Sequence, residues 1–125
     1  MTRYKYFKLS EFDSPDEPGS GRHIDPRLVD KLDMMREYCG FPFHVNSGVR
    51  TVAHNAIVGG RETSDHLIHM DGLGHGVDIA FPDATKGYAM LDAAFKYGIR
   101  RIGVGTTFLH FGNWYQNPQD VIWTY

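Results

Sequence analysis

Seven histidines in a chain of 125 residues are the feature of this sequence with the clearest chemical meaning. Histidine is the commonest metal ligand in proteins and titrates close to neutral pH. Two of the seven, His66 and His110, form with Asp78 a set of two imidazoles and one carboxylate. Such a set can hold zinc tetrahedrally and leave the fourth position to water. Zinc in that setting lowers the pKa of bound water to about 7 and polarises a carbonyl group.

The neighbours of two of these residues are apolar. Asp78 lies on an alternating segment, where an unpaired carboxylate would cost free energy that a metal ion would remove. His110 is flanked by Phe108, Leu109 and Phe111, so it either faces a partner or is a hydrogen-bonded core histidine. An aspartate before a turn can also serve only to cap it. The residues alone leave both the metal and the structural interpretation open.

The three segments that carry these residues lie far apart in the chain, so the fold must bring them together. Strands are predicted over 43–46, 77–81, 99–104, 107–111 and 121–125. Helices are predicted over 26–39, 51–57 and 84–97. The segments 13–21 and 61–76 have the composition of loops. With no repeat and no linker, residues 1–125 are expected to form one α+β domain.

The first long helix has clear start and stop signals. Asp25 can accept an N-cap hydrogen bond, Pro26 suits the first helical position, and Gly40 can take the left-handed position after the end. The side chains expected to face the core are Leu28, Leu32, Met35 and Cys39 of this helix and Tyr88, Leu91 and Phe95 of the helix over 84–97.

Several motifs in one order resemble the zinc D-Ala-D-Ala carboxypeptidase family and its phage endolysin relatives, which share a fold with the hedgehog signalling domain. The motifs are Ser47-Gly48-Val49-Arg50, Asn55-Ala56-Ile57-Val58-Gly59-Gly60, Ser64-Asp65-His66-Leu67, Gly74-His75-Gly76-Val77-Asp78-Ile79 and Phe108-Leu109-His110. The resemblance covers almost the whole chain. It implies a hedgehog/DD-peptidase-like fold with a small, mainly antiparallel sheet packed with helices.

The resemblance also implies roles for individual residues. His66, Asp78 and His110 would bind zinc, and Arg50 would pair with a carboxylate of a peptide substrate, a task that suits the planar guanidinium group. Ser64 would contact substrate or orient its loop. The plainer alternatives are a structural ion pair for Arg50 and a turn serine at position 64. Asn55 and the Gly59–Gly60 pair would shape the loop.

Two departures from the family pattern bear on catalysis. The stretch between His66 and Asp78 is longer than in the family, and its extra piece, Ile68–Leu73, could be a lid, a specificity loop or drift. Thr107 stands where several members carry a general-base glutamate, and no acidic residue follows His110 in the H-x-D pattern of others. General acid–base help is typically worth 10²–10⁴-fold. The remaining candidates for the base are Glu62, Asp65, His69, Asp71 and His75, and His69, Asp71 and His75 could also compete as ligands.

The composition of the chain limits the kinds of molecule and the cellular locations that we expect for it. A formal charge of −2 gives no electrostatic footprint for nucleic acid, and no apolar run is long enough to cross a membrane. The single cysteine allows no internal disulfide, and the first residues lack the apolar stretch of a signal peptide. We therefore expect synthesis in the cytoplasm. The resemblance to phage endolysins implies action on the cell wall after phage-assisted release or within a phage particle.

The leading functional prediction is a zinc-dependent peptidase that cleaves peptidoglycan stem peptides, as a D,D-carboxypeptidase or an endolysin-type endopeptidase. A second is a non-catalytic zinc-binding module of the same fold, with a structural or binding role in a phage and a phage particle or lysis system as partner. A third is a metal-free domain whose histidines are structural. Zinc content separates the third from the others, and hydrolysis of muropeptides separates the first two.

Overall fold

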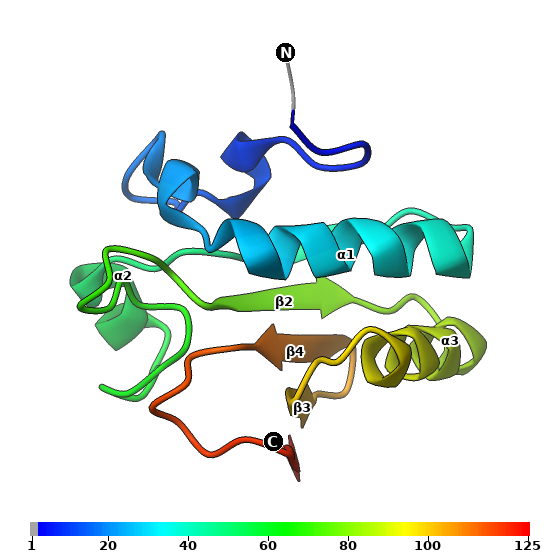
Figure 1. Ribbon diagram of the computed structural model, residues 1–125. Helices are drawn as coiled ribbons and strands as arrows, with labels where there is room; N and C mark the ends of the chain where they lie inside the picture. Colours follow the sequence, from blue (N-terminus) through cyan, green and yellow to red (C-terminus); the bar gives the residue numbers. More distant parts are fainter. Residues whose placement is uncertain (1–2) are drawn as a thin grey trace.

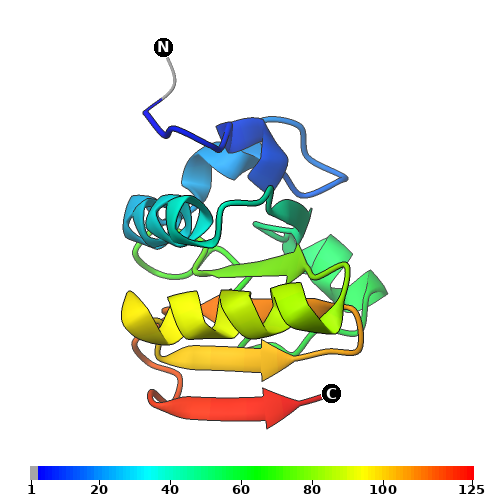
Figure 2. The ribbon, with the colours of Figure 1, turned by 90° about the vertical axis from the view of Figure 1, so that its right-hand side faces the viewer.

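The computed structural model describes residues 3–125 and has a five-stranded sheet at its centre (Figures 1 and 2). The strands are β1 (His44–Ser47), β2 (Gly76–Ala80), β3 (Arg101–Val104), β4 (Phe108–Gly112) and β5 (Val121–Thr124). They lie in the order β1-β2-β4-β3-β5. All pairings are antiparallel except β3 with β5, which is parallel. The predicted α+β class and mainly antiparallel sheet are confirmed.

Helices α1 (Pro26–Cys39), α2 (Val52–Ile57) and α3 (Ala84–Lys96) complete the regular structure with two short 3₁₀ helices. The predicted caps of α1 are confirmed, because the Asp25 carboxylate accepts a hydrogen bond from the Arg27 amide and Gly40 is left-handed at φ 78°. Helices α1 and α3 contact each other (Figure 1). None of the helices in residues 3–125 has the length and apolar character needed to cross a membrane.

The expected inward face of α3 is wrong for two of its three residues. Tyr88 and Phe95 are exposed, and Leu91 is half-buried. The buried residues of α3 are Gly87, Met90, Ala93 and Ala94. Small side chains let the helix approach its neighbours closely: a Cβ added to Gly87 would lie 3.1 Å from the ring of Phe81. Close approach therefore outweighs the size of the apolar side chains in setting the buried face.

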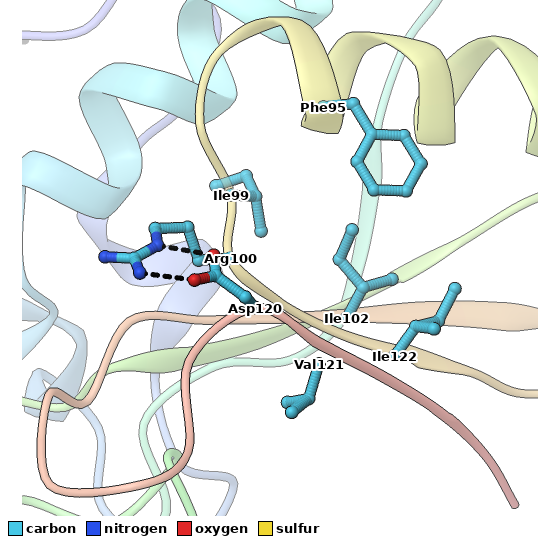
Figure 3. Close-up of a pocket in the computed structure, with 7 residues that line it drawn as sticks. All are labelled: Phe95, Ile99, Arg100, Ile102, Asp120, Val121 and Ile122. Carbon is cyan, nitrogen blue, oxygen red and sulfur yellow. Dashed lines mark hydrogen bonds and ion pairs between the residues drawn. The ribbon is translucent and has the colours of Figure 1, made fainter.

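Phe95 borders a cleft of about 240 Å³ between α3 and β5 (Figure 3). Apolar side chains form most of its lining, and Arg100 forms a two-bond ion pair with Asp120 at one end. The cleft lies on the α3 side of the sheet and contains none of the residues that the sequence singles out for chemistry.

The N-terminal segment folds more regularly than its composition indicates. It contains the 3₁₀ helices η1 (Leu9–Phe12) and η2 (Ser20–His23). The carbonyl of Phe12 accepts a hydrogen bond of 2.8 Å from the Val49 amide, and a Cβ on Gly48 would lie 2.5 Å from the Phe12 Cα. A glycine is therefore required where the chain leaves β1, and the N-terminal segment holds the turn that leads to Arg50.

The two faces of the sheet differ in chemistry. Val77 and Ile79 of β2 are fully buried in the hydrophobic core together with neighbours on β4. Successive side chains on a strand point to opposite faces, so Asp78 and His110 point away from this core. Alternation predicts β2 from the sequence, and the register of β2 with β4 places His110 on the same second face as Asp78.

Candidate metal centre

One row of paired residues runs across all five strands on the second face of the sheet. Asp78 pairs with His110 on one side and with Ser47 on the other. His110 in turn pairs with Gly103, and Gly103 with Trp123. Because residues in such a row project from the same face, the register alone brings the carboxylate beside the second imidazole.

His66 joins this pair from the loop between α2 and β2. Its Nε2 lies 3.1 Å from Asp78 Oδ1, and His110 Nδ1 lies 2.8 Å from the same oxygen. One ligand atom from each of the three residues lies within 4.8 Å of the other two. Within residues 3–125, this is the only cluster of three or more such side chains close enough to share an ion. The structure thus brings together the three residues that the sequence predicts as ligands.

In each of the two imidazoles, the ring nitrogen that does not face Asp78 (the outer nitrogen) already has a hydrogen-bond partner. His66 Nδ1 lies 2.6 Å from the carbonyl oxygen of Gly48, which can only accept a hydrogen bond. His110 Nε2 lies 2.8 Å from Asp65 Oδ2. Both outer nitrogens therefore carry hydrogen, and in the neutral rings both inner nitrogens present lone pairs to the carboxylate of Asp78.

Burial and charge set the protonation of the centre. Burial lowers the pKa of His66, against the smaller opposing effect of Asp78. Burial alone would raise the pKa of Asp78, but His110 and His66, when protonated, donate hydrogen bonds to its carboxylate and hold that pKa well below its usual range. Burial also disfavours the charged form of His110, yet its bonds to Asp65 and Asp78 outweigh this effect and raise its pKa. The centre therefore favours a positive charge beside Asp78.

The donor set fits zinc. Two imidazole nitrogens and one carboxylate oxygen converge, and the outer hydrogen bonds fix both rings in the tautomer that leaves the inner nitrogen free. Without a cation or a proton between them, the lone pairs of two ring nitrogens would face Asp78 Oδ1 at 2.8 and 3.1 Å. His66, Asp78 and His110 are thus able to hold a zinc ion.

Arg50 lies at the border of this centre. Its Nη2 is 3.3 Å from Asp78 Oδ2, the oxygen that faces away from the imidazoles, and its side chain is 14% exposed. Its Nε donates to Ser47 Oγ at 3.1 Å, and its Nη1 to Asn55 Oδ1 at 3.4 Å. The guanidinium group is therefore held beside the centre on a side chain that is partly exposed, a position that suits the carboxylate-binding role predicted for it.

The turn before His66 contains the other predicted site residue. Ser64 Oγ accepts a hydrogen bond of 3.2 Å from the His66 amide, and its carbonyl oxygen lies 2.8 Å from His69 Nε2. Ser64 therefore forms hydrogen bonds within the turn that presents His66, and the roles predicted for it stay predictions.

The five candidates for a general base do not converge on the centre. Asp65 reaches it only through His110 and is ion-paired to Arg101. His69 stacks on Trp114 with ring centroids 4.2 Å apart. Asp71 and His75 bond to each other, and Glu62 is exposed. Thr107 is also exposed, and its carbonyl oxygen accepts a hydrogen bond from Phe81. Among residues 3–125, no carboxylate next to the centre is free of an ion pair.

The insert Ile68–Leu73 folds back on itself. The His69 amide donates to the Leu73 carbonyl at 3.0 Å, and Asp71 Oδ2 lies 2.7 Å from His75 Nε2. His75 Nδ1 lies 2.8 Å from Asn113 Oδ1 and 3.2 Å from the Asp25 carboxylate. The loop histidine at position 75 is thus buried and joins the insert to the first turn of α1.

The surroundings of His75 lead to a prediction about the stability of the protein. Burial disfavours the charged form of His75, but hydrogen bonds to Asp25, Asn113 and Asp71 outweigh it and raise its pKa. A raised pKa in the folded state stabilises the protein below the unfolded value of about 6.5, and this stabilisation is lost as pH rises through the folded pKa. The pKa of Asp25 is lowered, so its contribution is lost only in acid.

We expect His75→Gln to lower the free energy of unfolding by about 3 kcal/mol near pH 6, because the buried carboxylate of Asp25 and the partly exposed one of Asp71 lose their cation. The difference between the two proteins should shrink as pH rises above about 7. Urea unfolding at several pH values measures it, and a constant difference from pH 6 to pH 9 would contradict the assigned charge. The charged or titratable groups that face His75 are Asp25, Asp71 and His69.

Sequence reasoning missed two residues that contact the centre. Trp123 of β5 lies against His110, with ring centroids 5.5 Å apart. Asp65 was considered only as a base, although it holds the outer nitrogen of His110. The x position in the motif S-x-H held the signal for Asp65, since a carboxylate next to a ligand histidine is a candidate partner for another ligand.

Comparison with known proteins agrees with the motifs and the geometry. The sequence profile described as Peptidase M15 matches residues 5–111, which include every predicted site residue. No curated protein sequence matches the chain. Members of the M15 family are zinc-dependent metallopeptidases, and the cluster of His66, Asp78 and His110 has the donor set that such an enzyme needs. The chain belongs to the peptidase M15 family.

Proposed function

We propose that this protein is a zinc-dependent peptidase that hydrolyses peptide bonds in the stem peptides of peptidoglycan, as a D,D-carboxypeptidase or as an endolysin-type endopeptidase. The observation that carries the proposal is the convergence of His66, Asp78 and His110 beside a partly exposed arginine. Family membership supports the reaction class, and the motif resemblance supports the substrate class.

The residues of the centre have separate roles in such a reaction. Zinc, when bound, supplies a Lewis acid and an acidified water for attack on a peptide carbonyl. His66, Asp78 and His110 would hold it, and their rings have Gly48 and Asp65 as outer hydrogen-bond partners. Arg50, whose side chain is partly exposed, is placed to bind a substrate carboxylate near the reacting carbonyl.

The missing base favours a second candidate function. Thr107 and the residues that follow His110 offer no acid or base, and the carboxylates beside the centre, Asp65 and Asp78, are both paired. A non-catalytic zinc-binding module of the same fold, serving in a phage particle, needs no such group. In the peptidase proposal, the protein instead acts on the wall after phage-assisted release or from within the particle.

Incubation with purified peptidoglycan decides between these functions. We expect the zinc-loaded protein to release fragments, identified by mass, that are shortened at one peptide bond. A chelator should abolish their release, and added zinc should restore it, because attack on the carbonyl depends on the ion. A protein that binds zinc and releases no fragment would support the non-catalytic module.

A further inference from the structure

Asp65 makes four polar contacts from a buried position outside the ligand set. Its side chain is 2% exposed. Oδ2 lies 2.8 Å from His110 Nε2 and accepts from Arg101 Nε at 3.1 Å. Oδ1 accepts from Arg101 Nε at 3.2 Å and from Asn117 Nδ2 at 3.1 Å. The carboxylate is therefore neutralised by one arginine and still directs one oxygen at the ligand ring.

Two glycines make room for this carboxylate. Gly76 of β2 and Gly112 of β4 are paired in the register, two residues along from the pair Asp78 and His110. A Cβ on Gly112 would lie 2.3 Å from Asp65 Oδ2 and 3.0 Å from His110 Nε2. A Cβ on Gly76 would lie 2.8 Å from the Asp65 Cβ. Side chains at these two positions would push Asp65 away from the ring.

Strand β3 and the connection between β4 and β5 supply the other groups that surround the Asp65 carboxylate. Arg101 of β3 pairs with Gly112 and reaches Asp65 across the space that the glycine leaves open. Asn117, on the connection between β4 and β5, also donates to the carbonyl oxygen of Thr63, two residues before Asp65. Elements on three sides thus hold one carboxylate in a single orientation.

We infer that Asp65 is a positioning residue for the metal centre: it keeps hydrogen on Nε2 of His110, so that Nδ1 is free for the ion. The inference rests on the metal site of the proposed function. An imidazole that binds a metal through one nitrogen commonly donates its other N–H to a carboxylate, which fixes the tautomer and makes the ligand more basic. Asp65 also explains why His110 presents Nδ1, since Nε2 is occupied.

Zinc affinity measured by competition with a chelator tests this inference without an activity assay. Loss of such an outer partner typically weakens metal binding by about 10- to 100-fold. We expect Asp65→Ala to raise the zinc dissociation constant within that range. We expect Asp65→Asn to raise it less, because the amide oxygen still accepts from His110. Gly112→Ala should act in the same direction, since it displaces the unaltered Asp65 from the ring.

Asn117→Ala is the matched control. It removes a hydrogen bond from the same carboxylate but leaves the contacts of Asp65 with His110 and Arg101. It should lower the free energy of unfolding and leave zinc affinity unchanged. Equal loss of affinity in Asn117→Ala and Asp65→Ala would reduce Asp65 to a structural role and overturn the inference.

A second measurement needs no variant and so does not depend on whether the variants fold. Long-range ¹H–¹⁵N correlation of the zinc-loaded protein should show His110 protonated at Nε2 and bound through Nδ1. The opposite assignment would overturn the inference while leaving the metal site intact. Failure of the unmodified chain to bind zinc would instead overturn the proposed function and this inference together.

Discussion

Replacing His66 with alanine should reduce bound zinc from about one ion per chain to almost none, because two protein ligands seldom hold zinc where three are needed. His66 is 3% exposed, and its Nε2 lies 3.1 Å from the Asp78 carboxylate, so the variant removes a ligand from the interior of the centre. Atomic absorption or mass spectrometry of the folded protein after dialysis measures the zinc content.

His69→Ala is the control for that measurement. His69 is only three residues further along, but its ring stacks on Trp114 and its Nε2 faces the carbonyl of Ser64. Zinc content should stay near one per chain in this variant. If His66→Ala retained its zinc and His69→Ala lost it, the ligand would have been assigned to the wrong histidine.

Replacing Arg50 with alanine should lower kcat/KM on peptides with a free terminal carboxylate by about 100-fold, which corresponds to roughly 2.7 kcal/mol of transition-state stabilisation. The guanidinium group lies beside Asp78 on a partly exposed side chain, where a substrate carboxylate can form a charge-assisted pair with it. Steady-state kinetics on a stem-peptide substrate measure the loss.

The same peptide with an amidated terminus separates binding of the carboxylate from any effect on the centre. Arg50→Ala should cleave the amidated peptide almost as well as the unaltered enzyme does, provided that its zinc content is unchanged. Arg50→Lys should recover only part of the loss, because a lysine keeps the charge but not the planar pair of donors. An equal loss of kcat/KM on both peptides would contradict the carboxylate-binding role and leave Arg50 only as a partner of Asp78.

The ligand set could be predicted because the order of the motifs resembles that of a known family, whereas the residues alone leave the metal interpretation open. Alternation in 77–81 indicates the strand that carries Asp78, and the resemblance assigns His66 and His110 to the same set. The structure brings the three together, and their binding of zinc stays a prediction until the ion is measured. Helix α1 was predicted at its exact bounds because Asp25, Pro26 and Gly40 mark its ends.

The features that could not be predicted depend on packing and register between elements that are distant in the sequence. The contact of Asp65 with His110 needs a glycine on each of two strands and an arginine on a third. No local signal specifies that β2 lies next to β4 in the register that pairs Gly76 with Gly112. The exposed face of α3 has a similar origin. Apolar spacing indicates Tyr88 and Phe95, whereas packing against α1 and the sheet selects the alanine face.

The pairing of β5 with β3 has a consequence for any attempt to isolate the catalytic unit. The matched region ends at residue 111, yet Asn117 and Trp123, which contact Asp65 and His110, follow it. A fragment cut at that boundary would leave β3 as a bare sheet margin, with unpaired amides and carbonyls ready to recruit another chain. Insolubility of such a fragment would therefore reflect the cut rather than the quality of the fold.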